Sequence, residues 1–302
     1  MKGKARGAPR RAYVDGAWVL GRRALGVLLV ALLVWGSLRV RSAVRGNERF
    51  HLDGWEIEVG ELPEWVTPEI RDEIRLACNG DSLPGSPEDW NVLDAGVIRR
   101  LRGALEASPW IARLASAKLE YPVIDSPGRL ALRLELRRPV ALVEHGGLYY
   151  LADPEARRLG YPYREPPTEW FNVPSIVGLS SPGPLPEPGE RWSSRDVGQG
   201  VEVARLLVED GIIRDFPDTP VRAVDLSNLH GRVSPRESEI VLWCGRQRLA
   251  WGRSPISAGA RTATSPEILR NLRFVLSNPT TFASYALIHL HRRQDDLTGV
   301  RG

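Results

Sequence analysis

An uncharged run of fifteen residues, Ala24 to Leu38, constrains this chain more than any other feature. The run is rich in leucine and valine, two arginines stand directly before it, and two more follow within three residues. A helix needs about 20 residues to cross ~30 Å of hydrocarbon. Arginines at the borders lengthen such a run, because their stems lie in apolar surroundings while the guanidinium reaches water. The sequence therefore predicts a transmembrane helix over residues 22–41.

Two kinds of segment other than an anchor carry apolar runs of this length. A buried helix of a soluble protein usually has a polar face, and this run has none. A cleaved secretory signal also carries an apolar region of about 7–15 residues behind a basic stretch. However, the run ends in Leu38-Arg39-Val40-Arg41, which offers no small-x-small cleavage site. An uncleaved anchor is favoured.

The basic residues around the run predict its orientation. Seven precede it and four follow it closely, so the positive-inside rule places the N-terminus in the cytoplasm. Residues 1–21 would then be a basic, mobile cytoplasmic tail. The protein is predicted to cross the cell inner (plasma) membrane once, with most of the chain outside the cytoplasm.

The charge of the chain is concentrated at this anchor. Residues 1–49 carry eleven basic and two acidic residues, whereas the remainder carries 30 basic and 35 acidic residues. A nucleic-acid-binding domain needs a basic face of its own, so the acidic remainder argues against that class. The basic lead is better suited to anionic lipid headgroups.

Residues 50–139 show the order β-α-α-β-β. Trp55 to Val59 alternates apolar and acidic residues, as in a half-buried strand. Val66, Ile70, Ile74 and Cys78 then recur every four residues on one helical face. Asp94 is expected to cap a second helix, whose apolar stripe is Val97, Ile98, Leu101, Ala104 and Leu105.

Two strands are predicted to close this domain as a hairpin. Ala115, Ala117, Leu119 and Tyr121 alternate with polar residues, and Leu130, Leu132, Leu134 and Leu136 do so more regularly. With the two helices covering their single apolar face, these strands indicate a compact α+β domain.

A second domain, residues 140–292, is predicted to be β-rich with two helices. The first helix covers residues 197–208, and the second begins at Ser265, the predicted N-cap, with Pro266 at its first position. Three strands are expected between the helices, and a last strand from Phe282 to His291. Residues 293–302 are expected to be a polar tail.

Five segments follow one another along these two domains: Ser108-Pro109-Trp110-Ile111, Tyr121-Pro122, Leu134 through Ala141, Leu148 through Asp153, and Val173-Pro174-Ser175-Ile176-Val177-Gly178. In this order they resemble the FtsQ/DivIB family of bacterial cell-division proteins. The resemblance runs from the apolar run to about His291. It implies a single transmembrane helix, a POTRA-like domain with the β-α-α-β-β order, and a β-rich FtsQ-type domain.

The resemblance also implies a function and partners. It implies a non-catalytic divisome scaffold at the division septum, which links FtsB- and FtsL-type single-span proteins and helps control septal peptidoglycan synthesis. The alternative is another POTRA-bearing membrane protein, acting in secretion or envelope assembly.

The last strand is the predicted docking surface. Residues 284–290 are apolar on both faces and contain no proline, and an edge strand of this kind offers its free N–H and C=O groups to another chain. The resemblance implies that this strand and the helix before it form the binding site for the partner FtsB. The strand could instead be covered by the chain's own tail. The residues assigned to the site are Tyr285, Ala286, Leu287, Ile288, His289 and Leu290, with Arg270, Arg273 and Phe274.

The sequence predicts no enzyme, cofactor, metal or small-molecule substrate. It contains none of the usual nucleophile, zinc or phosphate-loop motifs. His289 and His291 form an H-x-H pair but need a third ligand to bind a metal. Asp225 at a strand end is read as a turn former. Cys78 and Cys244 are read as buried apolar residues.

Overall fold

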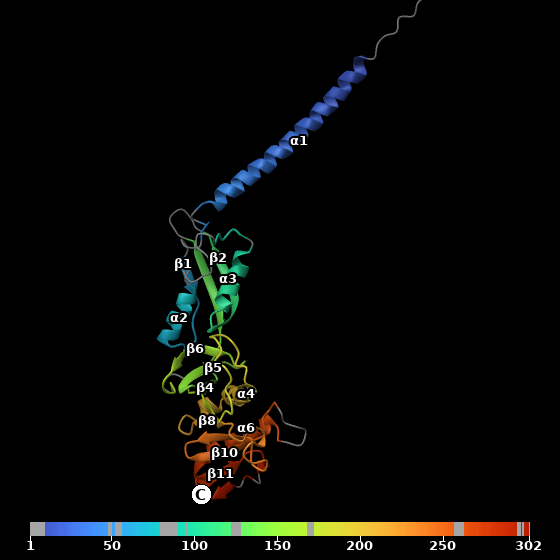
Figure 1. The fold of residues 1–302 in the computed structure, drawn as a ribbon. Coiled ribbons are helices and arrows are strands. Elements are labelled where there is room, and N and C mark those ends of the chain that lie inside the picture. Colours follow the sequence, from blue (N-terminus) through green and yellow to red (C-terminus); the bar gives the residue numbers. More distant parts are fainter. Residues whose placement is uncertain are drawn as a thin grey trace, which may run out of the picture.

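The computed structural model describes residues 10–47, 50–51, 56–78, 90–94, 96–121, 128–167, 172–256, 263–294, 297 and 299–301. The chain is mixed α+β, with one long N-terminal helix followed by two β-sheets. Figure 1 shows these parts succeeding one another, from the N-terminal helix, which runs obliquely to the rest, to the C-terminus at the far end.

The N-terminal helix, α1 (Arg10–Arg45), is 36 residues long. Its segment Leu25–Val44 is long and apolar enough to span a membrane, with a mean hydropathy of 1.8, and none of it is buried against the rest of the chain. The expectation of a mobile tail over residues 1–21 is wrong from Arg10 onward, because the helix already begins there. Residues 1–9 lie outside the described residues.

The first folded part, called the small unit (residues 56–136), has the β-α-α-β-β order expected from the sequence. Strand β1 (Glu56–Val59) is parallel to β3 (Arg129–Leu136), which is antiparallel to β2 (Ile111–Glu120), so the strand order is β1-β3-β2. Helices α2 (Pro68–Cys78) and α3 (Val97–Glu106) lie between the first two strands in sequence. Trp55, the expected start of β1, lies outside the described residues.

The helical periodicities are confirmed, and one predicted cap is wrong. Ile70, Ile74 and Cys78 of α2 are buried, as are Val97, Leu101 and Leu105 of α3. Gly96 occupies the N-cap position of α3. Asp94 lies two residues earlier, where its carbonyl accepts a hydrogen bond from Val97 N at 3.0 Å and its carboxylate lies 3.7 Å from Arg100. The helix starts later than expected because Asp94 belongs to the preceding turn.

The two antiparallel strands of the small unit differ in regularity. In β3 the predicted leucines are buried or half-buried, and the charged residues between them are exposed. In β2 the pairing register shifts twice, between Ile111 and Arg113 and between Leu114 and Ser116. After the second shift the predicted alternation holds, because Ala117 and Leu119 are half-buried between exposed polar residues. Ala115, at the second bulge, and Tyr121, beyond the end of the strand, are exposed.

The second part, called the body (residues 141–301), is built on a sheet that has nine strands in the described part of the chain. The order across the sheet is β12-β11-β10-β9-β8-β7-β4-β5-β6. The strands are β4 (Ala141–His145), β5 (Leu148–Ala152), β6 (Arg158–Tyr163), β7 (Ser175–Val177), β8 (Val221–Asp225), β9 (Ile240–Cys244), β10 (Gln247–Gly252), β11 (Tyr285–His289) and β12 (Gly299–Arg301).

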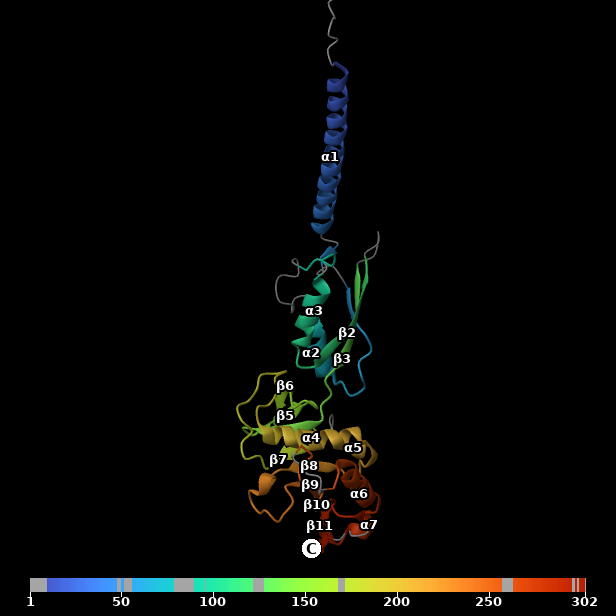
Figure 2. The ribbon, with the colours of Figure 1, turned by 90° about the vertical axis from the view of Figure 1, so that its right-hand side faces the viewer.

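Two long helices, α4 (Arg195–Glu209) and α6 (Ser265–Ser277), pack on the body sheet (Figure 2). Short helices α5 (Ile212–Asp215) and α7 (Pro279–Phe282) follow them. The predicted cap of α6 is wrong by one residue. Thr264 is the N-cap and forms a capping box with Glu267, so Ser265 is already helical.

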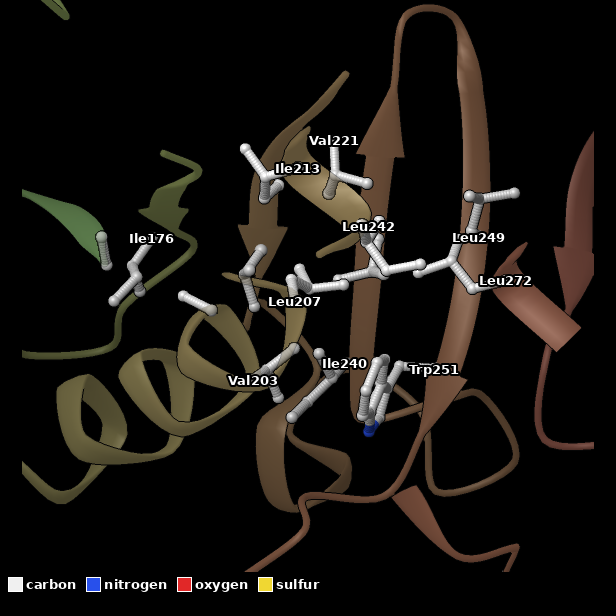
Figure 3. Close-up of a cluster of buried hydrophobic side chains, with 14 of the residues drawn as sticks. Ile176, Val203, Leu207, Ile213, Val221, Ile240, Leu242, Leu249, Trp251 and Leu272 are labelled. Atoms are coloured by element: carbon white, nitrogen blue, oxygen red, sulfur yellow. The ribbon is translucent and has the colours of Figure 1, made fainter. Parts of the chain in front are cut away.

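The body core lies between this sheet and the two helices. Figure 3 shows Leu242, Leu249 and Trp251 of the sheet facing Leu207 of α4 and Leu272 of α6. All five are fully buried. This packing fixes the two helices against one face of the sheet. The outermost strands, β12 and β6, form its two edges.

The small unit and the body share a core. Leu142, Leu151 and Leu159 are cross-strand neighbours in β4, β5 and β6, and all three pack into the small unit's hydrophobic cluster. Trp110 of the small unit is buried there, and its Nε1 donates to Glu73 Oε2 at 2.6 Å. The sheets change between residues 136 and 141, yet the apolar contact across this junction is continuous.

The close approach of α4 to β7 gives a test of this packing. A Cβ at Gly200 would lie 2.7 Å from Ile176 Cγ2, whereas one at Gly198 of the same helix would meet nothing within 4 Å. We expect Gly200→Ala to lower the free energy of unfolding by about 1–3 kcal/mol through overpacking. Gly198→Ala should raise it by up to about 1 kcal/mol, through helix propensity. Chemical denaturation of both variants measures this, and equal effects would contradict the packing described.

Candidate partner-binding edge of the sheet

Strand β11, the predicted docking strand, is not the edge of the sheet. It is parallel to β10 on one side and antiparallel to β12 on the other. The residues paired with β12 are Tyr285 with Arg301, Leu287 with Val300 and Ile288 with Gly299, and the register shift leaves Ala286 as a bulge. The expectation of a free β11 edge is therefore wrong, and the alternative, in which the chain's own tail covers the strand, is what the structure shows. Three residues are too few for an alternation that sequence reasoning detects.

Two side-chain amides fasten β11 at its ends. Gln247 Nε2 donates to the carbonyl of Phe282 at 2.7 Å, just before the strand. Asn271 Nδ2, on α6, donates to the carbonyls of Leu290 at 2.7 Å and Arg292 at 2.8 Å, just after it. Asn271 is buried, so its amide takes the place of water as the hydrogen-bond donor to these carbonyls. The strand is thus fixed independently of β12.

The two faces of β11 differ. Ile288 and Leu290 point into the body core and are fully buried. Leu287 is half-buried on the opposite face, in register with Arg248 of β10 and, through it, with the exposed Trp243 of β9. This second face offers apolar side chains beside the strand's backbone.

An aromatic row links α6 to β11. The ring centroids of Phe274 and Phe282 lie 5.9 Å apart, and those of Phe282 and Tyr285 6.3 Å apart. Phe274 is exposed, Phe282 is buried and Tyr285 is half-buried. The structure thus brings together two of the predicted site residues. Sequence reasoning missed Phe282, which lies between them. It placed this residue at the start of the last strand, whereas Phe282 is the last residue of α7.

The two predicted arginines differ in their surroundings. Arg273 is bound to Asp210 at 2.9 Å and Asp215 at 2.8 Å, and this ties α6 to the end of α4 and to α5. Arg270 is exposed on α6. The geometry therefore gives Arg273 a role in helix packing and leaves Arg270 at the surface.

The two predicted histidines lie side by side. The rings of His289 and His291 are 5.4 Å apart and nearly perpendicular. Burial lowers the pKa of both below the ordinary histidine value, and the positive charge of Arg292 acts in the same direction. Among the described residues, no three His, Cys, Asp or Glu side chains are grouped as metal ligands.

The remaining candidates have structural roles. Asp225 Oδ1 accepts hydrogen bonds from Ser227 N at 2.8 Å and Ser227 Oγ at 2.6 Å, which confirms it as a turn former. Cys78 and Cys244 are free, buried and in separate cores. Burial raises the pKa of Cys78 to about 11 and that of Cys244 in the same direction, as for unreactive core thiols.

No family model matches this chain, and no curated protein matches it either. The structure itself defines the class: a mixed α+β protein with a β-rich body and one N-terminal apolar helix that can span a membrane.

The two hydrogen bonds from Asn271 can be tested by removing the amide. We expect Asn271→Leu to lower the free energy of unfolding by about 2 kcal/mol, because two carbonyls at the end of β11 lose their donor. Asn278→Ala is the matched control, since its Nδ2 bonds a single exposed carbonyl, that of Phe274. Denaturation curves of both variants measure the difference. A loss as large for Asn278→Ala would show that Asn271 has no special role.

The lowered pKa values predict how stability depends on pH. Protons bind His289 and His291 less tightly in the folded state than in the unfolded state, so acid favours unfolding. Above the ordinary histidine pKa, we expect the two histidines to leave the free energy of unfolding unchanged. As pH falls through that value towards 5, they should lower it. The double variant His289→Asn, His291→Asn should lose less stability than the parent between pH 8 and pH 5. Identical pH profiles would refute the assignment.

Proposed function

We propose that this chain is a non-catalytic scaffold of the bacterial division machinery, anchored once in the cell inner membrane with its N-terminus in the cytoplasm. It would link FtsB- and FtsL-type single-span proteins at the septum and so help control septal peptidoglycan synthesis. The motif order that resembles the FtsQ/DivIB family supports this proposal. So does the combination of an apolar helix, a β-α-α-β-β unit and a β-rich body.

The observation that carries the proposal is the position of the last strands. The edge formed by β11 and β12 lies at the end of the molecule far from α1 (Figure 1). A partner that crosses the same membrane can reach it with an extended extracytoplasmic segment. Leu287 and the aromatic row from Phe274 to Tyr285 supply apolar contacts beside the strand backbone.

The covering strand β12 has a place in this mechanism. It spans three residues against the five of β11, and its register is interrupted by a bulge. A longer partner strand would form more main-chain hydrogen bonds with β11 than β12 does. Since Gln247 and Asn271 hold β11 from its other side, β11 would keep its place when β12 leaves. We propose that the partner strand replaces β12.

Substitution on β11 tests this surface. We expect Leu287→Lys or Tyr285→Lys to abolish co-purification of the single-span partner in mild detergent, because a charge would enter the apolar contact. Tyr161→Lys is the matched control: Tyr161 is an exposed aromatic residue on β6, at the opposite edge of the same sheet. Thermal unfolding of each variant checks that the fold persists. Unchanged co-purification with folded Leu287→Lys would remove this site.

Truncation separates replacement from simple addition. Deleting residues 299–302 removes β12 and should strengthen partner binding if the partner takes its place. Weaker binding would mean that the partner pairs with β12 itself. Recovery of an outer-membrane barrel in place of single-span proteins would favour the secretion alternative.

A further inference from the structure

A polar cleft of about 550 Å³ opens beside the end of β11, on the body. One wall is the segment that carries His289, His291 and Arg292, and the opposite wall is the 230–239 loop. The indole of Trp251 also lines it. The volume lies within the range of small-ligand sites. The cleft meets the predicted docking strand at His289, whereas the apolar contacts of the partner-binding proposal lie at Leu287 and Tyr285.

The first wall is held rigidly. His291 packs against Gly252, where a Cβ would lie 3.1 Å from His291 Cβ. Gly252 has φ +109°, which side-chain-bearing residues rarely adopt, so both its conformation and its lack of a side chain admit the histidine. Asn271 fixes the carbonyls on both sides of His291.

The opposite wall is held by one buried amide. Asn228 Nδ2 donates to the carbonyls of Ser234 at 2.8 Å, Glu237 at 3.2 Å and Ser238 at 3.1 Å. Its Oδ1 accepts from the backbone N–H groups of Val233 at 2.9 Å and Ser234 at 2.8 Å. With five hydrogen bonds from a single side chain, the loop is shaped before any ligand arrives.

Trp251 contributes an unused donor. Its side chain is fully buried, yet its Nε1 has no hydrogen-bond partner among the described residues. Figure 3 shows the indole nitrogen at the end of the ring away from Leu242 and Leu249. A buried N–H without a partner is costly, and Trp251 is one of the residues that line the cleft.

The charges around the cleft favour an anion. Three arginines, Arg236, Arg253 and Arg292, line it together with two carboxylates, Glu237 and Glu239. This leaves one excess positive charge while the histidines are neutral. Protonation of His289 and His291, which line it, would add up to two more. Guanidinium and imidazolium groups are donors that suit carboxylate and phosphate oxygens.

We infer that this cleft binds a small ligand bearing a carboxylate or phosphate group, held between Arg292 and Arg253, and that acid strengthens the binding. The ligand's oxygens would accept hydrogen bonds from the guanidinium groups and from protonated His289 and His291. Arginines in the same walls would repel a metal cation.

Calorimetric titration of the full chain in detergent micelles, with inorganic phosphate and with citrate as separate probes, tests this inference. We expect binding of about 1 mM or tighter for at least one probe, and tighter binding at pH 5.5 than at pH 7.5. The probe that binds distinguishes phosphate from carboxylate. Saturation by neither probe at either pH would overturn the inference.

Matched variants locate the binding. Arg292→Ala and Arg253→Ala should each weaken it about tenfold or more, through loss of a charge-assisted hydrogen bond. Arg270→Ala, an exposed arginine on α6 that does not line the cleft, should leave it unchanged. Thermal unfolding confirms that the variants are folded. Equal affinity in all three variants would show adventitious binding elsewhere. His289→Asn with His291→Asn should abolish the pH dependence, and its persistence would contradict the role given to the imidazoles.

Discussion

Three leucines from neighbouring strands of the body, Leu142, Leu151 and Leu159, complete the core of the small unit. Burial of each is worth about 1.5–3 kcal/mol, a contribution that neither part could obtain alone. The junction is reinforced by the ion pair of Arg137 with the buried Asp153, at 3.2 Å. The two sheets are consequently joined through packed side chains and not by a bare linker. The orientation of the last strands relative to the small unit follows from this contact.

The ends of the body sheet are protected in different ways. At one end, β6 carries Pro162, and a proline on an edge strand has no N–H to offer to another chain. At the other end, the chain's own β12 covers β11 over three residue pairs. The first protection is built into the strand, whereas the second is a separate three-residue strand that follows the buried Leu297. This asymmetry makes the β11 end the more suitable place for an added strand.

Sequence reasoning recovered the elements that bury one regular face. The four-residue spacing of Ile70, Ile74 and Cys78 and the alternating leucines of β3 report their burial directly. It failed where tertiary contacts decide which structure a segment adopts. Strand β12 is too short to have a period, and Phe282 could be placed in α7 only once the turn after Asn278 was seen. The polar cleft was also missed, because it joins a loop near residue 230 to histidines some sixty residues later.

The most direct measurement of the central claim is the position of the full chain, carrying a fluorescent protein at its N-terminus, in dividing cells. A single-span scaffold that is recruited through the far end of its body should concentrate in a band at midcell. That band should weaken in the Leu287→Lys variant of β11 and persist in the Tyr161→Lys variant. Fluorescence spread evenly around the envelope, with no midcell band, would contradict the account.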